Sequence, residues 1–219
     1  MKVLQDLNVS ELKTLLVGYG EKPYRAEQIF KGLAAGRSIS EITNISKELR
    51  DRLKAEYAET AVEIIETKRS ETDGTEKHLL RLWDGNVIET VVMKYKYGIT
   101  QCVSTQVGCR MGCAFCASGI GGLVRNLTAG EIYSEVAVVN RLLGGTLDKR
   151  SVTNVVLMGS GEPLDNYDEV IKFLRLLSDE KGLNVSPRNV SLSTSGLVPN
   201  MYRLAEEGLD VNLTVSLHN

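Results

Sequence analysis

The chain has 219 residues, of which 42% are hydrophobic and 25% charged, and its net charge at pH 7 is −2. This composition predicts a soluble protein that buries one sizeable core, with room for a small second domain. The longest apolar runs fall far short of the roughly 20 residues of a membrane-spanning helix. The chain as a whole also lacks the excess of basic residues that is typical of nucleic-acid-binding proteins.

Residues 1–60 predict a small helical accessory domain, because their apolar residues recur with helical spacing and their charges nearly balance. Residues 61–98 change to short strand-like runs separated by Asp73-Gly74 and Asp84-Gly85, which are typical hairpin turns. They predict a β-meander that follows the helices. Three helix starts are marked by residues that favour this place: Ser10, Pro23 and Ser46.

Residues 99–219 alternate apolar strands with amphipathic helices, giving four strands (QCVSTQV, NVVLMG, NVSLSTS and VNLTVSLHN) and three helices between them. Such repetition indicates a parallel sheet wrapped by helices, either an open sheet or part of a barrel. A barrel needs more strands than these, so we expect an α/β fold that is an incomplete βα barrel.

Three cysteines, Cys109, Cys113 and Cys116, follow the first strand with C-x3-C-x2-C spacing. This pattern favours a [4Fe-4S] cluster, in which three thiolates leave one iron open to a small chelating molecule. Zinc would need a fourth ligand, and none of the candidates Cys102, His78 and His218 has the short spacing of zinc modules. A disulfide framework is disfavoured because four cysteines are sparse and no secretory signal is evident. We therefore expect a cytosolic chain with reduced thiols.

The other strands also end in motifs, and the carboxyl ends of parallel strands are where βα folds bind ligands. The second is followed by GSGEP (159–163), the third ends in STSG (193–196) and the fourth in SLH (216–218). Alone, each has a plain explanation as a turn, a helix start or a buried histidine. Together they predict one site, in which glycines allow close approach and Glu162 could hold a cationic amine.

Charge is uneven around the cysteines, because no acidic residue occurs between Thr90 and Gly130. That favours an anionic substrate near the cluster, although these cations could equally offset thiolate and sulfide charge. The basic residues concerned are Lys94, Lys96, Arg110 and Arg125.

In combination, these motifs resemble the radical S-adenosylmethionine superfamily, whose cluster and GEP-type motif occupy these places on a partial (βα)6 barrel. Residues 88–132, with MGSGEPLDN, LSTSG and VNLTVSLH, resemble the RlmN-type dual-specificity RNA methyltransferases within it. That family methylates C2 of an adenosine in 23S ribosomal RNA and in certain transfer RNAs. The related Cfr-type enzymes, which methylate C8, share much of the pattern, but QVGC and VRNLTAGEI are more similar to RlmN.

Residue by residue, the resemblance implies that Cys109, Cys113 and Cys116 ligate the cluster. Glu89 matches the acid-base carboxylate of the family. Cys102 matches the cysteine that resolves a covalent protein-RNA intermediate, whereas from the residues alone it could be a buried small hydrophobe. The S-adenosylmethionine site would comprise Gly161, Glu162, Ser193, Ser216, Leu217 and His218.

A radical route is implied as well, because adenine C2 is electrophilic and closed to ordinary methyl transfer. In the family, a cysteine near the C-terminus carries the methyl group, and it would lie beyond Asn219. We therefore expect an incomplete, inactive portion of the enzyme, the alternative being a non-catalytic iron-sulfur or RNA-binding fragment. The resemblance further implies 23S rRNA and tRNA as partners, a flavodoxin-like reductant, a disulfide bond, and a full-length monomer in the cytoplasm.

Overall fold

The computed structural model describes residues 2–217, and its first part contains the predicted helices. The helix starts differ in detail. The first helix is capped by Asn8, not Ser10, because the Asn8 side chain accepts from Glu11 N at 2.9 Å and Glu11 returns the bond to Asn8 N. Ser46 does cap its helix. The segment comprises η1 (Leu4–Asp6), α1 (Val9–Gly18), α2 (Arg25–Ala34) and α3 (Lys47–Glu56).

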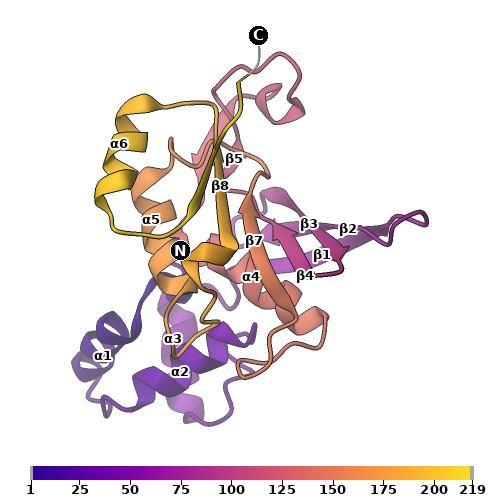
Figure 1. The fold of residues 1–219 in the computed structure, drawn as a ribbon. Helices are drawn as coiled ribbons and strands as arrows, with labels where there is room; N and C mark the ends of the chain where they lie inside the picture. Colours follow the sequence, from indigo (N-terminus) through magenta and orange to yellow (C-terminus); the bar gives the residue numbers. More distant parts are fainter. Residues whose placement is uncertain (1, 218–219) are drawn as a thin grey trace.

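A seven-stranded mixed sheet forms the centre of the molecule, with α1 to α3 gathered beyond one end of it (Figure 1). Its antiparallel half is the predicted meander, with turns at Gly74 and Gly85, extended by one more strand. This half contains β1 (Val62–Arg69), β2 (Glu76–Leu82), β3 (Val87–Tyr95) and β4 (Gly98–Cys102). The parallel half continues from β4 with β7 (Val152–Leu157), β8 (Val190–Thr194) and β9 (Asn212–Val215).

The parallel strands are joined by the three predicted helices, which confirms the partial βα barrel. None of the helices between residues 2 and 217 is long and apolar enough to cross a membrane. The connecting helices are α4 (Ala129–Leu142), α5 (Tyr167–Leu177) and α6 (Val198–Glu206), and a short turn η3 (Pro187–Asn189) precedes β8.

The prediction that QCVSTQV forms one barrel strand is wrong in its second half. The chain leaves the large sheet after Cys102 and then forms β5 (Gln106–Gly108), which pairs with β6 (Leu123–Asn126) in a separate two-stranded sheet. The chain bends because Thr105 N and Gln106 N donate to Ser160 O, at 2.8 and 3.1 Å, instead of continuing the ladder. The β5–β6 connection, which includes η2 (Ala117–Gly119), carries the three clustered cysteines, and we call residues 109–122 the cysteine loop.

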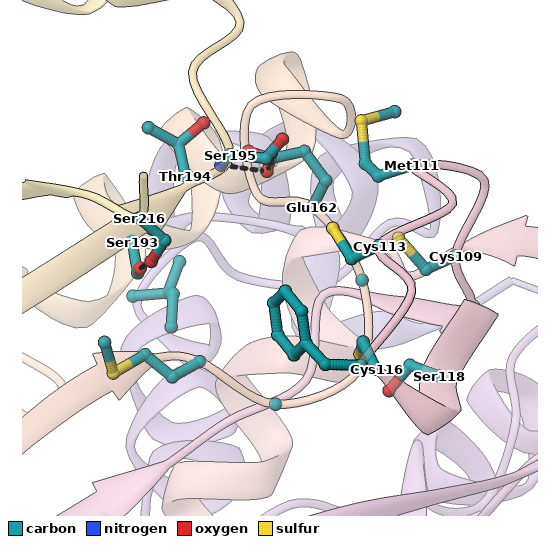
Figure 2. Close-up of a pocket in the computed structure, with 15 residues that line it drawn as sticks. Cys109, Met111, Cys113, Cys116, Ser118, Glu162, Ser193, Thr194, Ser195 and Ser216 are labelled. Carbon is teal, nitrogen blue, oxygen red and sulfur yellow. Dashed lines mark hydrogen bonds between the residues drawn. The ribbon is translucent and has the colours of Figure 1, made fainter. Parts of the chain in front are cut away.

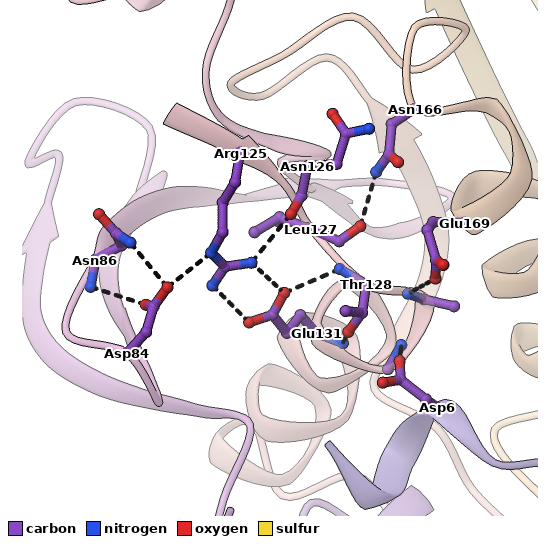
Figure 3. A network of polar contacts seen from close by, with 12 residues as sticks. Asp6, Asp84, Asn86, Arg125, Asn126, Leu127, Thr128, Glu131, Asn166 and Glu169 are labelled. Carbon is purple, nitrogen blue, oxygen red and sulfur yellow. Dashed lines mark hydrogen bonds and ion pairs between the residues drawn. The ribbon is translucent and has the colours of Figure 1, made fainter. Parts of the chain in front are cut away.

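Arg125 on β6 joins three parts of the chain (Figure 3). Its guanidinium binds both carboxylate oxygens of the fully buried Glu131 on α4, at 2.8 Å each, and Asp84 in the meander turn at 2.7 Å. At the N-terminus of the same helix, Gly130 N donates to Asp6, 2.7 Å away. These contacts hold the helical segment, the meander and the barrel around one apolar core.

Candidate active site

A cavity of about 250 Å³ lies where the cysteine loop faces the carboxyl ends of the parallel strands (Figure 2). The cysteines line one side of it, and serines from β8 and from the residue after β9 line the other. The wall is formed by Cys109, Met111, Cys113, Phe115, Cys116, Ser118, Leu157, Met158, Gly159, Gly161, Glu162, Ser193, Thr194, Ser195 and Ser216.

Most of the residues predicted for the site meet at this cavity. Seven of them line it, namely Cys109, Cys113, Cys116, Gly161, Glu162, Ser193 and Ser216. Leu217 is not part of the cavity wall and is 88% exposed. His218 lies outside the described residues. Glu89 and Cys102 lie in β3 and β4, beside the cavity wall and not in it.

The cysteine loop is fixed by its own backbone and by one ion pair. Cys109 N donates to Gly122 O at 3.1 Å, and Cys116 N to Cys113 O at 3.0 Å. Arg110 binds both carboxylate oxygens of Asp165 in the loop after β7. The structure does not support the expected disulfide bond, since all four cysteines are free thiols.

The thiols have the right chemistry for an iron-sulfur cluster. No three His, Cys, Asp or Glu side chains between residues 2 and 217 converge as they would around a single metal ion. Convergence on one point is what a zinc site requires. In a cubane cluster each thiolate binds a different iron, so three thiols spread along one side of a cavity fit the cluster better than they fit zinc.

Glu162 is buried in the cavity wall, 4% exposed, and its carboxylate already accepts three hydrogen bonds from the protein. One oxygen accepts from Ser195 N at 2.8 Å and Ser195 Oγ at 3.0 Å, and the other from Leu164 N at 3.0 Å. A carboxylate offers about four acceptor positions, so about one remains for a cationic ligand. Ser195 was not among the predicted site residues, although the STSG motif contains it.

Gln106 holds the loop after β7 in place, and sequence reasoning missed it. Its side chain is fully buried, accepts from Glu162 N at 2.9 Å, and donates to Asn126 and Asp165 at 2.8 and 2.9 Å. Burial alone would raise the pKa of Asp165, but hydrogen bonds from Arg110 and Gln106 outweigh it and lower that pKa below its ordinary value. The sequence signal that could have identified Gln106 is its polar amide within a predicted buried strand, because buried amides are normally hydrogen-bonded.

Gly161 is required by its backbone and by Gln106. Its φ is +107°, and a Cβ there would lie 2.6 Å from Gln106 Cβ. We expect Gly161→Ala to lose about 1–3 kcal/mol of unfolding free energy to backbone strain and about 1–3 kcal/mol more to overlap, measured by urea unfolding. Gly208 is the matched control, because its φ is +66° and no atom lies within 4 Å of a Cβ there. Equal losses in both variants would contradict this account.

Ser104 connects Glu89 to the cavity. Its hydroxyl donates to Glu89 O at 2.7 Å and accepts from Ser160 N at 3.0 Å, while its amide donates to the buried Glu135. The Glu89 carboxylate itself is half-exposed and pairs with Lys77 at 2.9 Å. Burial, reinforced by Glu135, raises the pKa of the Cys102 thiol to about 11.

The unbalanced basic charge around the cysteines is mostly compensated by the fold. Lys94 pairs with Glu76, Arg110 with Asp165, and Arg125 with Asp84 and Glu131. Within residues 2–217 only Lys96 of the four has no ion pair. The acidic partners come from outside the 90–130 window, which is why the sequence pattern overstated the positive charge.

Two family profiles match the chain: the radical SAM superfamily over residues 103–219, and the ribosomal RNA large subunit methyltransferase N-terminal domain over residues 3–58. Two similar relatives carry the name "Probable dual-specificity RNA methyltransferase RlmN". The one from Lachnoclostridium phytofermentans is 50% identical and covers 98% of this chain, which spans 60% of that protein. The one from Clostridium perfringens strain SM101 is 49% identical and covers the whole chain, which spans 62% of it.

The fold is also similar to a crystal structure of a radical SAM methyltransferase from Sphaerobacter thermophilus, with a TM-score of 0.91 and 42% sequence identity. That comparison covers all of this chain and 64% of the other. The chain thus spans about 60% of the length of the relatives it matches. With its cysteine motif, its partial barrel and these matches, the chain belongs to the radical SAM superfamily and carries both matched regions of the RlmN-type proteins.

Proposed function

We propose that this chain is the cluster-binding and cofactor-binding part of a radical SAM RNA methyltransferase that acts on C2 of an adenosine in 23S rRNA and in certain tRNAs. The observation that carries the proposal is the cavity that three cysteines share with Glu162 at the carboxyl ends of the parallel strands. The names of the relatives favour C2 over C8 methylation.

Cys109, Cys113 and Cys116 would hold a [4Fe-4S] cluster, and S-adenosylmethionine would occupy the cavity beside it. When bound, the two would supply the electron and the carbon radical that methylation of an electrophilic carbon requires. Glu162 would place the amine of the cofactor with its remaining acceptor position, and the Ser193 and Ser216 hydroxyls offer polar partners on the opposite side. The cavity volume is near the lower end of small-molecule sites.

Glu89 and Cys102 would act on the base. Glu89 would take the C2 proton, and its half-exposed position leaves it open to a substrate once it releases Lys77. Cys102 would resolve the protein-RNA intermediate. Because its raised pKa keeps it a thiol at neutral pH, a base must take its proton before it can react as a thiolate.

The partners follow from the same proposal: 23S rRNA and tRNA as substrates, and a flavodoxin-like protein as one-electron donor. A cytoplasmic, monomeric full-length protein is part of it. The second candidate, a non-catalytic iron-sulfur or RNA-binding fragment, rests on one observation, the three cysteines that share the cavity and could hold a cluster without turnover.

A chimera separates the two candidates. This chain, continued with the remaining part of the Lachnoclostridium phytofermentans relative, should form 2-methyladenosine in a 23S rRNA fragment after anaerobic reconstitution, detected by mass spectrometry of nucleosides. The 219 residues alone should not. Glu89→Gln and Cys102→Ala in the chimera should stop turnover and keep the cluster, whereas Glu63→Gln, in another exposed glutamate of the meander, should leave methylation unchanged. Methylation by the 219 residues alone, or full activity of Glu89→Gln, would contradict the assignment.

A further inference from the structure

The hairpin that joins β3 to β4 ends in two tyrosines that no core uses. In the sequence Lys94-Tyr95-Lys96-Tyr97, the rings of Tyr95 and Tyr97 are stacked, with centroids 5.0 Å apart and planes 8° apart. Tyr95 is 47% exposed and Tyr97 is 71% exposed. Hairpin turns favour small polar residues and glycine, so two exposed aromatic rings at this place call for a ligand.

This hairpin tip is held firmly by the barrel. Gly98, with φ +143°, allows Thr153 on β7 to approach so closely that a Cβ on Gly98 would overlap its hydroxyl. That hydroxyl donates to Ile99 O at 3.0 Å. Tyr95 Oη lies 3.4 Å from the sulfur of Met93 on the same strand. The ring stack is therefore a preformed surface, and binding to it requires little ordering of the protein.

Two lysines flank the rings in the sequence. Lys96 is exposed without an ion pair among residues 2–217, and Lys94 shares the partly buried Glu76. Because Ile99 pairs with Val152, the segment with Lys149 and Arg150 leads to the same end of the sheet. Arg150 donates to the backbone oxygens of Leu183 and Asn184, so its charge stays uncompensated by those contacts. The carboxylates nearby in sequence or register are Glu76, Asp148, and Glu71 and Asp73 in the turn before β2.

The tyrosines are connected with the candidate active site along one face of β3. Glu89 and Tyr95 are six residues apart on one strand, so both side chains lie on the same face, about 20 Å apart. Cys102 on β4 pairs with Val91 and therefore also lies on that face. A strand of nucleic acid whose reacting base lies near Glu89 and Cys102 could run along this face to the hairpin tip.

We propose that Tyr95 and Tyr97 form a stacking platform for an unpaired RNA base outside the reacting adenosine, with Lys96 contacting the backbone. The inference rests on the proposed function, which supplies RNA as the ligand. Base stacking on aromatic side chains tolerates any sequence, and a duplex does not present free base faces to such a platform. The site therefore selects single-stranded segments and leaves sequence choice to other contacts.

The test is binding of a fluorescein-labelled single-stranded RNA dodecamer to the 219-residue chain, measured by anisotropy at several salt concentrations. Tyr95→Ala/Tyr97→Ala should weaken binding about tenfold with an unchanged salt slope. Tyr95→Phe/Tyr97→Phe should restore it, since phenylalanine also stacks. Lys96→Ala should lower the salt slope by about one. Tyr202→Ala, which removes a 72% exposed tyrosine on α6, is the matched control and should bind like the parent.

Unchanged affinity of the double alanine variant, or no binding by the parent chain, would overturn the platform. An equal loss toward the same RNA as a duplex would also overturn it, because the tyrosines would then contact the backbone. Equal thermal unfolding midpoints of the parent and the variants would show that the hairpin still folds. Methylation by the chimera described above tests the proposed function separately, so failure of the platform leaves that result intact.

Discussion

Replacing Arg125 by methionine should lower the free energy of unfolding by about 3–5 kcal/mol, because the change leaves the buried Glu131 carboxylate without its partner. The same side chain also holds Asp84, so the meander turn loses its link to the barrel. Urea unfolding followed by the fluorescence of Trp83, next to Asp84, reports this loss directly.

Arg188→Met provides the matched control. Arg188 pairs with Asp210 at 3.1 Å, but the two side chains are 80% and 70% exposed, so the pair is worth at most about 1 kcal/mol. Similar losses in the two variants would mean that the Arg125 contacts do not carry the stability that their burial implies.

The dependence of the unfolding free energy on pH below about 4 tests the same network independently. Burial would raise the pKa of Asp84, but hydrogen bonds from Arg125 and Asn86 outweigh it and lower the pKa to about 2. A lowered folded-state pKa contributes stability above the ordinary value of 3.8, and that contribution is lost as the pH falls toward 2. Arg125→Met should flatten this part of the profile.

Much of the barrel could be predicted from the sequence because its signals are local. The strands β7 and β8 bury apolar residues, and the helices α4 and α5 bury most of theirs, so the alternation is readable without a structure. The meander was equally readable from its two Asp-Gly turns. The cavity followed from the rule that ligands bind at the carboxyl ends of parallel strands.

The rest depends on contacts between distant residues. The short strand β5 pairs with β6 through Gln106 and Asn126, twenty residues apart, and three residues carry no periodic signal. The cap at Asn8 was a local signal by contrast, because Glu11 three residues later completes the capping box, a spacing that Ser10 does not have. The partners of Arg110 and Arg125 lie up to 55 residues away, so local charge counting could not show that they are neutralised.

A triple alanine replacement of Cys109, Cys113 and Cys116 should abolish cluster binding altogether, the largest functional effect expected in this chain. All three thiols line one cavity, and no other cysteine does among the residues described. Cys102→Ala is the matched control, because this thiol lies in β4, outside the cavity wall.

The most direct measurement is the iron and sulfide content of the 219-residue chain after anaerobic reconstitution, together with its visible thiolate-to-iron absorption. We expect about four irons per chain for the parent and for Cys102→Ala, and none for the triple variant. Zinc in place of iron, or a cluster that survives in the triple variant and disappears in Cys102→Ala, would contradict the assignment of the three cysteines.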